Sequence, residues 1–492
     1  MNLVIKGHSF LYETENLLRV FFPTEKIEST TERTEEERYI ITSLTPVENG
    51  ADIEITVNIG EGEKTERLSV SLKERDEKES DDTFLERSLE VFLYGILCKE
   101  TLYTPPWGIL TGVRPAKLMS NLLSDMNTQE AKNYFKNTLC VSEEKTNLAY
   151  TVSQMEEPII NKSRDKSFSL YVSIPFCPTR CSYCSFVSHS NESAKKLMPQ
   201  YTELLVKEIE ETAKITNELG LTLETVYIGG GTPTALDEES LKRVTDALSE
   251  YFPMKGVREY TIEAGRPDSI TREKLRIIKN AGATRISINP QTFNDDVLVE
   301  IGRKHTAKQT EDAMLLAREE GFTNINMDLI AGLPTDTMES FEDSLKKVLS
   351  FDAENITVHT LALKRSSTLV TEDRRKGSAD LATRMLSYTY KTLTEKGYSP
   401  YYMYRQSKCL GNLENVGWAK EGRECEYNVY MMEETHTVLA VGAGAVIKLR
   451  NPKTKEIERI FNYKYPYEYI SGFSEILSRK RRIVEFYNEI IG

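Results

Sequence analysis

Cysteine is scarce in this chain of 492 residues, and long apolar runs are absent from it. Its seven cysteines are an odd number and far too few for the disulfide framework of a small secreted protein. No segment approaches the roughly 18 consecutive apolar residues of a membrane-spanning helix. The opening segment, MNLVIKGHSFLYETENLLRVFF, has acidic residues where a signal peptide has a basic region followed by an apolar one. We therefore expect a cytoplasmic protein without a membrane span.

An excess of basic charge is missing as well. The chain has 63 Lys and Arg residues against 76 Asp and Glu residues, which gives a net charge of −13. Because nucleic-acid binding needs clustered basic side chains, nucleic acid is not an expected partner. A small basic pocket for an acidic ligand is compatible with this balance. The apolar and charged fractions, 39% and 28%, are ordinary for a globular protein.

The length predicts roughly two to four domains, and residues 1–165 are typical of a separate α+β domain. The sequence does not indicate the role of this domain. Alternating runs, DIEITVNIG (52–60) and RLSVSLK (67–73), indicate half-buried antiparallel strands. Helical patterns follow at 81–103, 114–124 and 142–160.

Residues 166–380 alternate between short β-rich runs and helical patterns. Such alternation is typical of βαβ units with a parallel sheet. The six predicted strands are 168–176, 223–231, 259–265, 284–291, 324–334 and 355–363. Because a closed barrel of this type has eight units, we expect an open, partial (β/α)6 barrel. Functional residues in such folds gather at the C-terminal ends of the strands.

Residues 381–492 predict an α+β extension, which we expect to cover the substrate. It contains a strand-like run at 438–449 and a terminal helix at 475–491. Two segments, 398–405 and 461–470, are rich in tyrosine, and we interpret them as packing.

Three thiols stand close together directly after the first predicted strand of the barrel. The sequence CPTRCSYC places Cys177, Cys181 and Cys184 in a C-x3-C-x2-C spacing. A structural zinc ion takes four closed ligands, whereas three thiolates on a cluster of four irons leave one iron open for a non-protein ligand. The spacing alone also allows a zinc site completed by a distant His or Cys, or three inert thiols.

Further unusual residues follow the other predicted strands. The second strand ends in GGGTP, and glycines there let a backbone approach a ligand and offer it N–H groups. Glu263, Gln291 and Arg303 lie at or near strand ends, and Asp328 lies within the fifth strand, where a carboxylate would suit ribose hydroxyls. Together with the thiols, these residues predict an iron–sulfur cluster with a nucleoside cofactor beside it.

On these residues the sequence resembles the radical S-adenosylmethionine (SAM) superfamily, whose hallmark is C-x3-C-x2-C. The motifs YVSIPFCPTRCSYCSF, GGGTPT, RISINPQTF, IGRKH and NINMDLIAGLP are similar to the oxygen-independent coproporphyrinogen III oxidase-like family. Three further segments resemble the HemZ branch of that family: TGVRPAK (111–117), RQSKCLGNLENVGWAK (405–420) and VGAGA (441–445).

The resemblance implies a role for each matching residue. Cys177, Cys181 and Cys184 would hold a [4Fe-4S] cluster, and Tyr171, Gly230 and Glu263 would contact the SAM that completes it. The residues matching positions around SAM or a second SAM-like ligand are Tyr183, Gly231, Thr232, Gln291, Arg303, Asp328 and Ala362. No residue is assigned as a catalytic acid or base.

The resemblance also implies a reaction. An electron donor such as flavodoxin or ferredoxin would reduce the cluster, and cleavage of SAM would give a radical that takes hydrogen from a propionate of a tetrapyrrole. Loss of carbon dioxide and one electron would leave a vinyl group, turning coproporphyrinogen III into protoporphyrinogen IX. Two alternatives stay open, a radical SAM methyltransferase that opens haem and a non-enzymatic haem chaperone. GNLENVGW (411–418) lacks the His-Asn pair of the chaperone relatives.

Some positions depart from the pattern or suggest substrate contacts. Ser173 and Phe186 stand where the characterised oxidases carry His and Cys. The basic candidates for gripping substrate carboxylates are Lys364, Arg365, Arg405, Lys448 and Arg450, with solvated surface charge as the alternative. The candidate tetrapyrrole contacts are His305, His359 and His436, with a structural histidine as the alternative.

Overall fold

The computed structural model describes the whole chain except residues 24, 33–35, 61, 78, 113, 185–188, 191–195, 363–377, 407–408 and 492. The chain forms two compact units. The first unit comprises residues 1–150, 378–383 and 405–414, and the second comprises 151–377, 384–404 and 415–492. The domain boundaries at residues 165 and 380 stay a prediction. Within the described ranges, no helix combines the length and the apolar character needed to cross a membrane.

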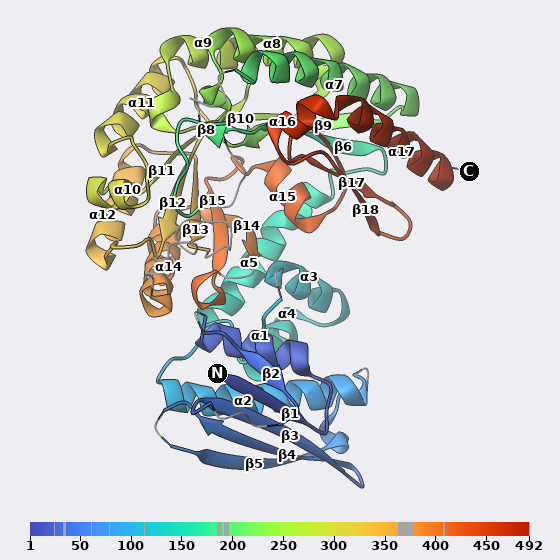
Figure 1. Ribbon diagram of the computed structural model, residues 1–492, viewed down its shortest axis with the longest axis vertical. Coiled ribbons are helices and arrows are strands. Elements are labelled where there is room, and N and C mark those ends of the chain that lie inside the picture. Colours follow the sequence, from blue (N-terminus) through green and yellow to red (C-terminus); the bar gives the residue numbers. More distant parts are fainter. Residues whose placement is uncertain are drawn as a thin grey trace. The chain divides into compact units, whose positions relative to one another are not determined.

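The first unit contains a five-stranded sheet in the order β2-β1-β3-β4-β5 (Figure 1). Its strands are β1 (Asn2–Lys6), β2 (Glu28–Thr30), β3 (Tyr39–Val47), β4 (Gly50–Asn58) and β5 (Lys64–Ser71). The alternating runs at 52–60 and 67–73 correspond to β4 and β5, which pair in antiparallel fashion as predicted.

The helices of this unit are α1 (Leu11–Phe21), α2 (Asp81–Thr101), α3 (Pro115–Asp125), α4 (Thr128–Asn133), a π-helical turn (Tyr134–Thr138) and the first part of α5 (Glu143–Ile160). The three predicted helical segments are confirmed as α2, α3 and α5. Helix α2 begins after Ser80, whose hydroxyl accepts a hydrogen bond from the Thr83 amide and caps the helix.

The second unit is built on an eleven-stranded sheet in the order β14-β15-β13-β12-β11-β10-β9-β6-β16-β17-β18. The six predicted strands are confirmed as β6 (Ser167–Ile174), β9 (Thr222–Gly230), β10 (Glu259–Gly265), β11 (Arg285–Gln291), β12 (Ile325–Ala331) and β13 (Asn355–Thr360). They pair in parallel and in chain order. Their side chains are almost all buried, as in a parallel sheet covered on both faces.

Helices connect these strands and cover their outer face (Figure 1). They are α7 (Met198–Leu219), α8 (Glu238–Tyr251), α9 (Arg272–Asn280), α10 (Asp295–Glu300), α11 (Ala307–Glu319) and α12 (Met338–Ser350). The partial (β/α)6 barrel is thus confirmed. A short two-stranded sheet, β7 (Phe176–Cys177) with β8 (His189–Ser190), follows β6.

The C-terminal extension adds strands to both ends of the same sheet. At one end lie β14 (Ser399–Arg405) and β15 (Glu414–Ala419), and at the other β16 (Thr437–Val441), β17 (Val446–Arg450) and β18 (Ile457–Phe461). Strand β16 pairs in parallel with β6, so the parallel run has seven strands. The prediction of one strand at 438–449 was wrong. The chain reverses at Gly442, whose φ of 94° lies in the left-handed region that favours glycine.

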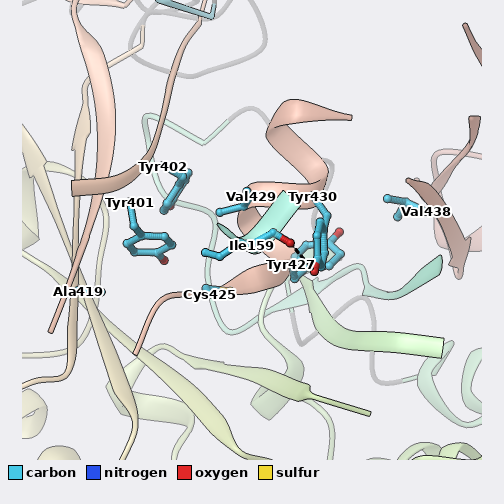
Figure 2. Packing of buried hydrophobic residues seen from close by; sticks show 9 residues of the cluster. All are labelled: Ile159, Tyr401, Tyr402, Ala419, Cys425, Tyr427, Val429, Tyr430 and Val438. Carbon is cyan, nitrogen blue, oxygen red and sulfur yellow. Dashed lines mark hydrogen bonds between the residues drawn. The ribbon is translucent and has the colours of Figure 1, made fainter. Parts of the chain in front are cut away.

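The extension also contains α14 (Ala379–Glu395), α15 (Glu426–Glu433), α16 (Pro466–Ser471) and α17 (Phe473–Ile491), the last of which confirms the predicted terminal helix. Figure 2 shows α15 among a buried cluster of Ile159, Tyr401, Tyr402, Ala419, Cys425, Tyr427, Val429, Tyr430 and Val438. Glu259 on β10 fixes the start of α15, because its carboxylate accepts hydrogen bonds from the Glu426 amide (2.9 Å) and the Cys425 thiol (3.1 Å).

Candidate active site

A cavity of about 360 Å³ lies in the second unit, at the ends of the parallel strands. Its lining includes every predicted site residue except Ala362, namely Tyr171, Cys177, Cys181, Tyr183, Cys184, Gly230, Gly231, Thr232, Glu263, Gln291, Arg303 and Asp328. Ala362 follows β13 and is not among the lining residues. The strand-end prediction therefore holds for the location of these residues, and their individual cofactor contacts stay a prediction.

The cysteine loop is held by backbone hydrogen bonds on two sides. The amide of Thr232 donates to the carbonyl of Phe176, directly before Cys177 (2.8 Å), and the amide of Ser182 donates to the Ile301 carbonyl (2.9 Å). A Cβ atom at Gly231 would lie 2.6 Å from the Phe176 carbonyl oxygen and 3.0 Å from the Cys177 Sγ atom. Only glycine therefore fits where the second strand of the barrel meets the thiols.

The three thiols line one wall of the cavity. Among the described residues, no group of three or more Cys, His, Asp or Glu side chains could hold a single metal ion. Thiolates are the usual ligands of iron–sulfur clusters. The guanidinium groups of Arg266 and Arg303 lie near Cys181. The donor set and its charge fit a cluster held by three thiolates.

A buried carboxylate lines the same cavity as the thiols. Glu263 accepts a 2.5 Å hydrogen bond from the Tyr227 hydroxyl. Burial raises the pKa of Glu263 to about 7, with a smaller contribution from Asp328, and the bond from Tyr227 acts in the opposite direction. A cationic ligand beside Glu263 would stabilise the ionised carboxylate.

Two residues that line the cavity carry polar atoms without protein partners. The Oε1 atom of Gln291 and the Nε atom of Arg303 are buried and have no hydrogen-bond partner within the described part of the chain. Gln291 has a φ of 70°, in the left-handed region, which costs about 1–3 kcal/mol for a non-glycine residue. Unsatisfied buried groups and a strained backbone are typical of a ligand site.

A network of hydrogen-bonded polar side chains extends across β11, β12 and β13. Asn326 donates to Ser287 (2.8 Å) and to Oδ1 of Asp328 (2.7 Å), and it accepts a bond from Thr357 (2.9 Å). The other carboxylate oxygen of Asp328 lies 3.6 Å from Nε2 of His359. All five side chains line the cavity. The prediction that Asp328 is a polar site residue within a strand agrees with this network.

Aromatic and methionine side chains form the remaining wall. The rings of Tyr171 and Tyr427 stack at 6.2 Å between centroids, and those of Tyr227 and Tyr427 at 4.5 Å. The other members of this aromatic wall are Tyr402, Tyr404, Met431 and Met432. The interpretation of segment 398–405 as packing is thus correct for Tyr401, which lies in the buried cluster, and incomplete for Tyr402 and Tyr404.

The three candidate histidines have different surroundings. His359 lines the cavity. His436 is buried outside it, within hydrogen-bond distance of Ser163 (2.9 Å) and Ser169 (2.7 Å), and burial lowers its pKa to about 3. His305 is also buried outside the cavity lining. His436 therefore has the hydrogen bonds of a structural histidine, whereas both ring nitrogens of His305 lack a hydrogen-bond partner within the described residues.

The basic candidates do not line the cavity in the described residues. Arg405 belongs to the first unit, where its guanidinium lies over the Trp107 ring at 5.2 Å. Lys448 forms an ion pair with Glu434 (3.1 Å), and Arg450 lies on the same strand. The remaining candidates, Lys364 and Arg365, lie outside the described residues, as does Phe186. Ser173 is buried and donates to the Ala443 carbonyl (2.7 Å).

Sequence reasoning missed Arg266 and, apart from Tyr171, the residues of the aromatic wall. Arg266 lies directly after β10, and the motif GRPD gave no signal of its own. Tyr427, Met431 and Met432 come from α15, which lies far along the chain from the barrel strands that it contacts.

The sequence is similar to one family model and to several proteins of known name. The sequence model of the Radical SAM superfamily matches residues 171–348. The oxygen-independent coproporphyrinogen-III oxidase-like protein HemZ of Bacillus subtilis (strain 168) is 36% identical over 398 residues, which are 79% of each chain. The heme chaperone HemW of the same organism is 33% identical over 298 residues, which cover 60% of this chain and 74% of that protein.

A solved structure of a radical SAM enzyme is also similar to this chain. Coproporphyrinogen III oxidase (HemN) from Escherichia coli, a radical SAM enzyme, has a TM-score of 0.52 and 25% sequence identity, and the match covers 66% of this chain and 72% of that chain. The cofactors of the superfamily are a [4Fe-4S] cluster and SAM. The chain belongs to the oxygen-independent coproporphyrinogen III oxidase-like family of the radical SAM superfamily, in its HemZ branch.

Proposed function

We propose that the protein is a radical SAM oxidoreductase that oxidatively decarboxylates the propionates of coproporphyrinogen III. The observation that carries the proposal is the lining of one cavity by the three thiols, a glycine loop and the aromatic wall. The similarity to a coproporphyrinogen-III oxidase-like protein over 79% of both chains supports the choice of substrate.

The proposed reaction converts each propionate to a vinyl group. When bound, the cluster and SAM supply, after one electron has entered, a carbon radical that removes a hydrogen atom from the propionate side chain. Loss of carbon dioxide and one further electron from that side chain leaves the vinyl group. The entering electron comes from a donor such as flavodoxin or ferredoxin, and the departing electron goes to an acceptor.

In this proposal the side chains of the protein bind and orient SAM and the substrate, and they exclude water from the reacting carbon. Gly230 and Gly231 let the end of β9 pack closely beside the thiol loop, because a Cβ atom at either position would lie 3.1 Å or less from the backbone at Ile174 or Phe176. Glu263, held by Tyr227, receives the cationic part of SAM. The aromatic wall offers flat apolar faces to a tetrapyrrole and keeps water from the reacting carbon.

Coproporphyrinogen III carries four carboxylates, whereas few cations line the cavity. Among the described lining residues the arginines are Arg266 and Arg303, and both already contact the cysteine loop. His359 is the other lining side chain that can become positive, when it is protonated. We therefore assign His359 as a contact for one substrate carboxylate.

Product analysis of the reconstituted protein tests the proposal. The protein is loaded with iron and sulfide without oxygen and incubated with SAM, dithionite and coproporphyrinogen III. The proposal predicts 5′-deoxyadenosine, carbon dioxide and a divinyl product. Formation of 5′-deoxyadenosine with unchanged substrate would overturn the substrate assignment alone. In a parallel incubation with haem in place of coproporphyrinogen III, S-adenosylhomocysteine with a methylated linear tetrapyrrole would instead identify a methyltransferase.

A haem chaperone is the second candidate, favoured by the 33% identity to HemW and by the position of His359 in the cavity. A chaperone binds haem in a fixed ratio and transfers it without turnover. Haem titration of the protein, with His359→Ala beside the parent chain, distinguishes the two candidates. Tight binding that needs His359, together with no vinyl product, would favour the chaperone.

A further inference from the structure

Arg266 lies between the strand that carries Glu263 and the loop that carries the thiols. It directly follows β10, lines the cavity and is only 2% exposed. A buried guanidinium is costly unless its charge is paired and its N–H groups are hydrogen-bonded. The contacts of Arg266 therefore indicate what this side chain does.

Two groups of contacts hold the guanidinium. Its Nε and Nη2 atoms donate to the two carboxylate oxygens of Asp268, at 2.9 and 2.7 Å. Its Nη1 atom donates to the Thr179 carbonyl (3.3 Å) and hydroxyl, and lies 4.0 Å from Sγ of Cys181. Arg266 thus joins β10 to a loop more than 80 residues away in the chain.

The backbone at Arg266 is fixed as well. Its carbonyl accepts hydrogen bonds from the amide (3.0 Å) and the hydroxyl (2.8 Å) of Ser269, within the 3₁₀ turn Pro267–Ser269. The Thr234 hydroxyl lies 2.7 Å from the Ser269 hydroxyl. The guanidinium is therefore oriented by the protein before any cofactor binds.

The charges of the two arginines near Cys181 are paired differently. Arg303 donates to the Asn289 carbonyl (2.6 Å) and the Tyr183 hydroxyl (3.2 Å), and within the described residues it forms no ion pair with a carboxylate. The charge of Arg266 is balanced by Asp268. Hydrogen bonds to cluster sulfurs and nearby charge set the reduction potential of an iron–sulfur cluster. Positive charge favours the reduced cluster, which carries one more electron.

We propose that Arg266 is a positioning residue for the cysteine loop and that the Arg266–Asp268 pair sets the reduction potential of the cluster. The inference rests on the cofactors of the family and not on the proposed tetrapyrrole substrate. Failure of the substrate proposal would therefore leave it intact.

The test compares the iron content and the midpoint potential of reconstituted variants by redox titration with EPR detection. Arg266→Gln removes a positive charge, so the potential should fall. Asp268→Asn removes a negative charge and keeps the arginine, so the potential should rise. Arg266→Lys keeps the charge but loses the bidentate pair, so the potential should stay near that of the parent while less iron is bound.

Arg272→Gln serves as the matched control, because Arg272 forms surface ion pairs with Glu319 and Glu320 and does not line the cavity. Its cluster should match the parent in iron content and potential. Shifts of opposite sign in Arg266→Gln and Asp268→Asn are the expected result. Unchanged potentials, or shifts of the same sign, would overturn the proposal. If Arg266→Gln binds no iron, the potential of Asp268→Asn decides, and an unshifted value overturns it.

Discussion

Tyr227 donates a 2.5 Å hydrogen bond to Glu263 on the adjacent strand of the barrel. The two residues lie on neighbouring strands, β9 and β10, and both face the cavity. The bond stabilises the carboxylate, whereas burial favours its neutral form, and the balance leaves the pKa of Glu263 at about 7. The charge of Glu263, the proposed contact for SAM, therefore changes near neutral pH.

The first prediction concerns the pH dependence of SAM binding. As pH rises through about 7, Glu263 ionises, and binding of the SAM cation should strengthen by about tenfold between pH 6 and pH 8. Tyr227→Phe removes the bond that favours the carboxylate, so its profile should shift to higher pH. Equilibrium binding to the reconstituted protein measures both profiles. Glu263→Gln should bind weakly at every pH, and an unchanged profile in that variant would contradict the assignment.

The raised pKa of Glu263 also affects the stability of the folded protein in the absence of SAM. Because the pKa is raised in the folded state, the unfolded chain ionises first as pH rises. The free energy of unfolding should therefore decrease as pH rises from about 4.5 towards about 7 through this group. Replacement by glutamine should remove this contribution.

The second prediction concerns the glycine loop. Gly231→Ala places a Cβ atom 2.6 Å from the Phe176 carbonyl oxygen and 3.0 Å from the Cys177 Sγ atom, so the loop must move away from the thiols. The variant should bind less iron and sulfide than the parent after anaerobic reconstitution. Gly256→Ala is the matched control, because a Cβ atom there meets nothing within 4 Å. Equal iron content in all three proteins would contradict the steric argument.

The third prediction concerns the first unit. Burial, with smaller contributions from Glu86 and Glu13, raises the pKa of Glu90 on α2 to about 8. Because this pKa is higher in the folded protein, the contribution of Glu90 to the free energy of unfolding decreases as pH rises. The decrease extends from about 4.5, the pKa of the group in the unfolded chain, towards about 8. Glu90→Gln should raise the melting temperature more at pH 8.5 than at pH 5. Thermal unfolding followed by circular dichroism checks this, and an equal effect at both values would refute it.

Sequence patterns predicted the local parts of this fold well. The six barrel strands are short, buried and β-rich, so their composition identifies them without knowledge of their partners. The C-x3-C-x2-C loop is likewise a local spacing. Since parallel strands end at the same edge, placing these motifs at strand ends was enough to predict that they line one cavity.

Sequence patterns did not predict the contacts between residues far apart in the chain. Strand β16 pairs with β6 across about 270 residues of chain, and nothing in the run VLAVGAGAVIKL specifies that partner. Tyr427 reaches the cavity because Glu259 caps the start of α15, a bond between residues 168 positions apart. Arg266 bonds Thr179 over 87 positions. Each of these features depends on tertiary packing that a single sequence does not display.

The last prediction tests how the C-terminal extension is held to the barrel. Glu208 on α7 is fully buried and pairs with Lys480 on α17, which is 1% exposed, at 3.1 Å. The same carboxylate accepts hydrogen bonds from Gly442, Asn462 and Tyr469, at 2.7 to 2.8 Å. One acidic side chain of the barrel thus binds four groups of the extension.

Glu208→Ala should lower the free energy of unfolding by about 3–5 kcal/mol, because it leaves the ammonium group of Lys480 buried without its partner. Glu203→Ala is the matched control on the same helix, since its pair with Lys207 is about half exposed and screened by water, so its loss should lower the free energy of unfolding much less. Urea unfolding of both variants provides the measurement. If they lose similar stability, the ion pair does not anchor the extension. If Glu208→Ala and the double variant with Lys480→Met unfold at the same urea concentration, the unpaired charge is not the cause of the loss.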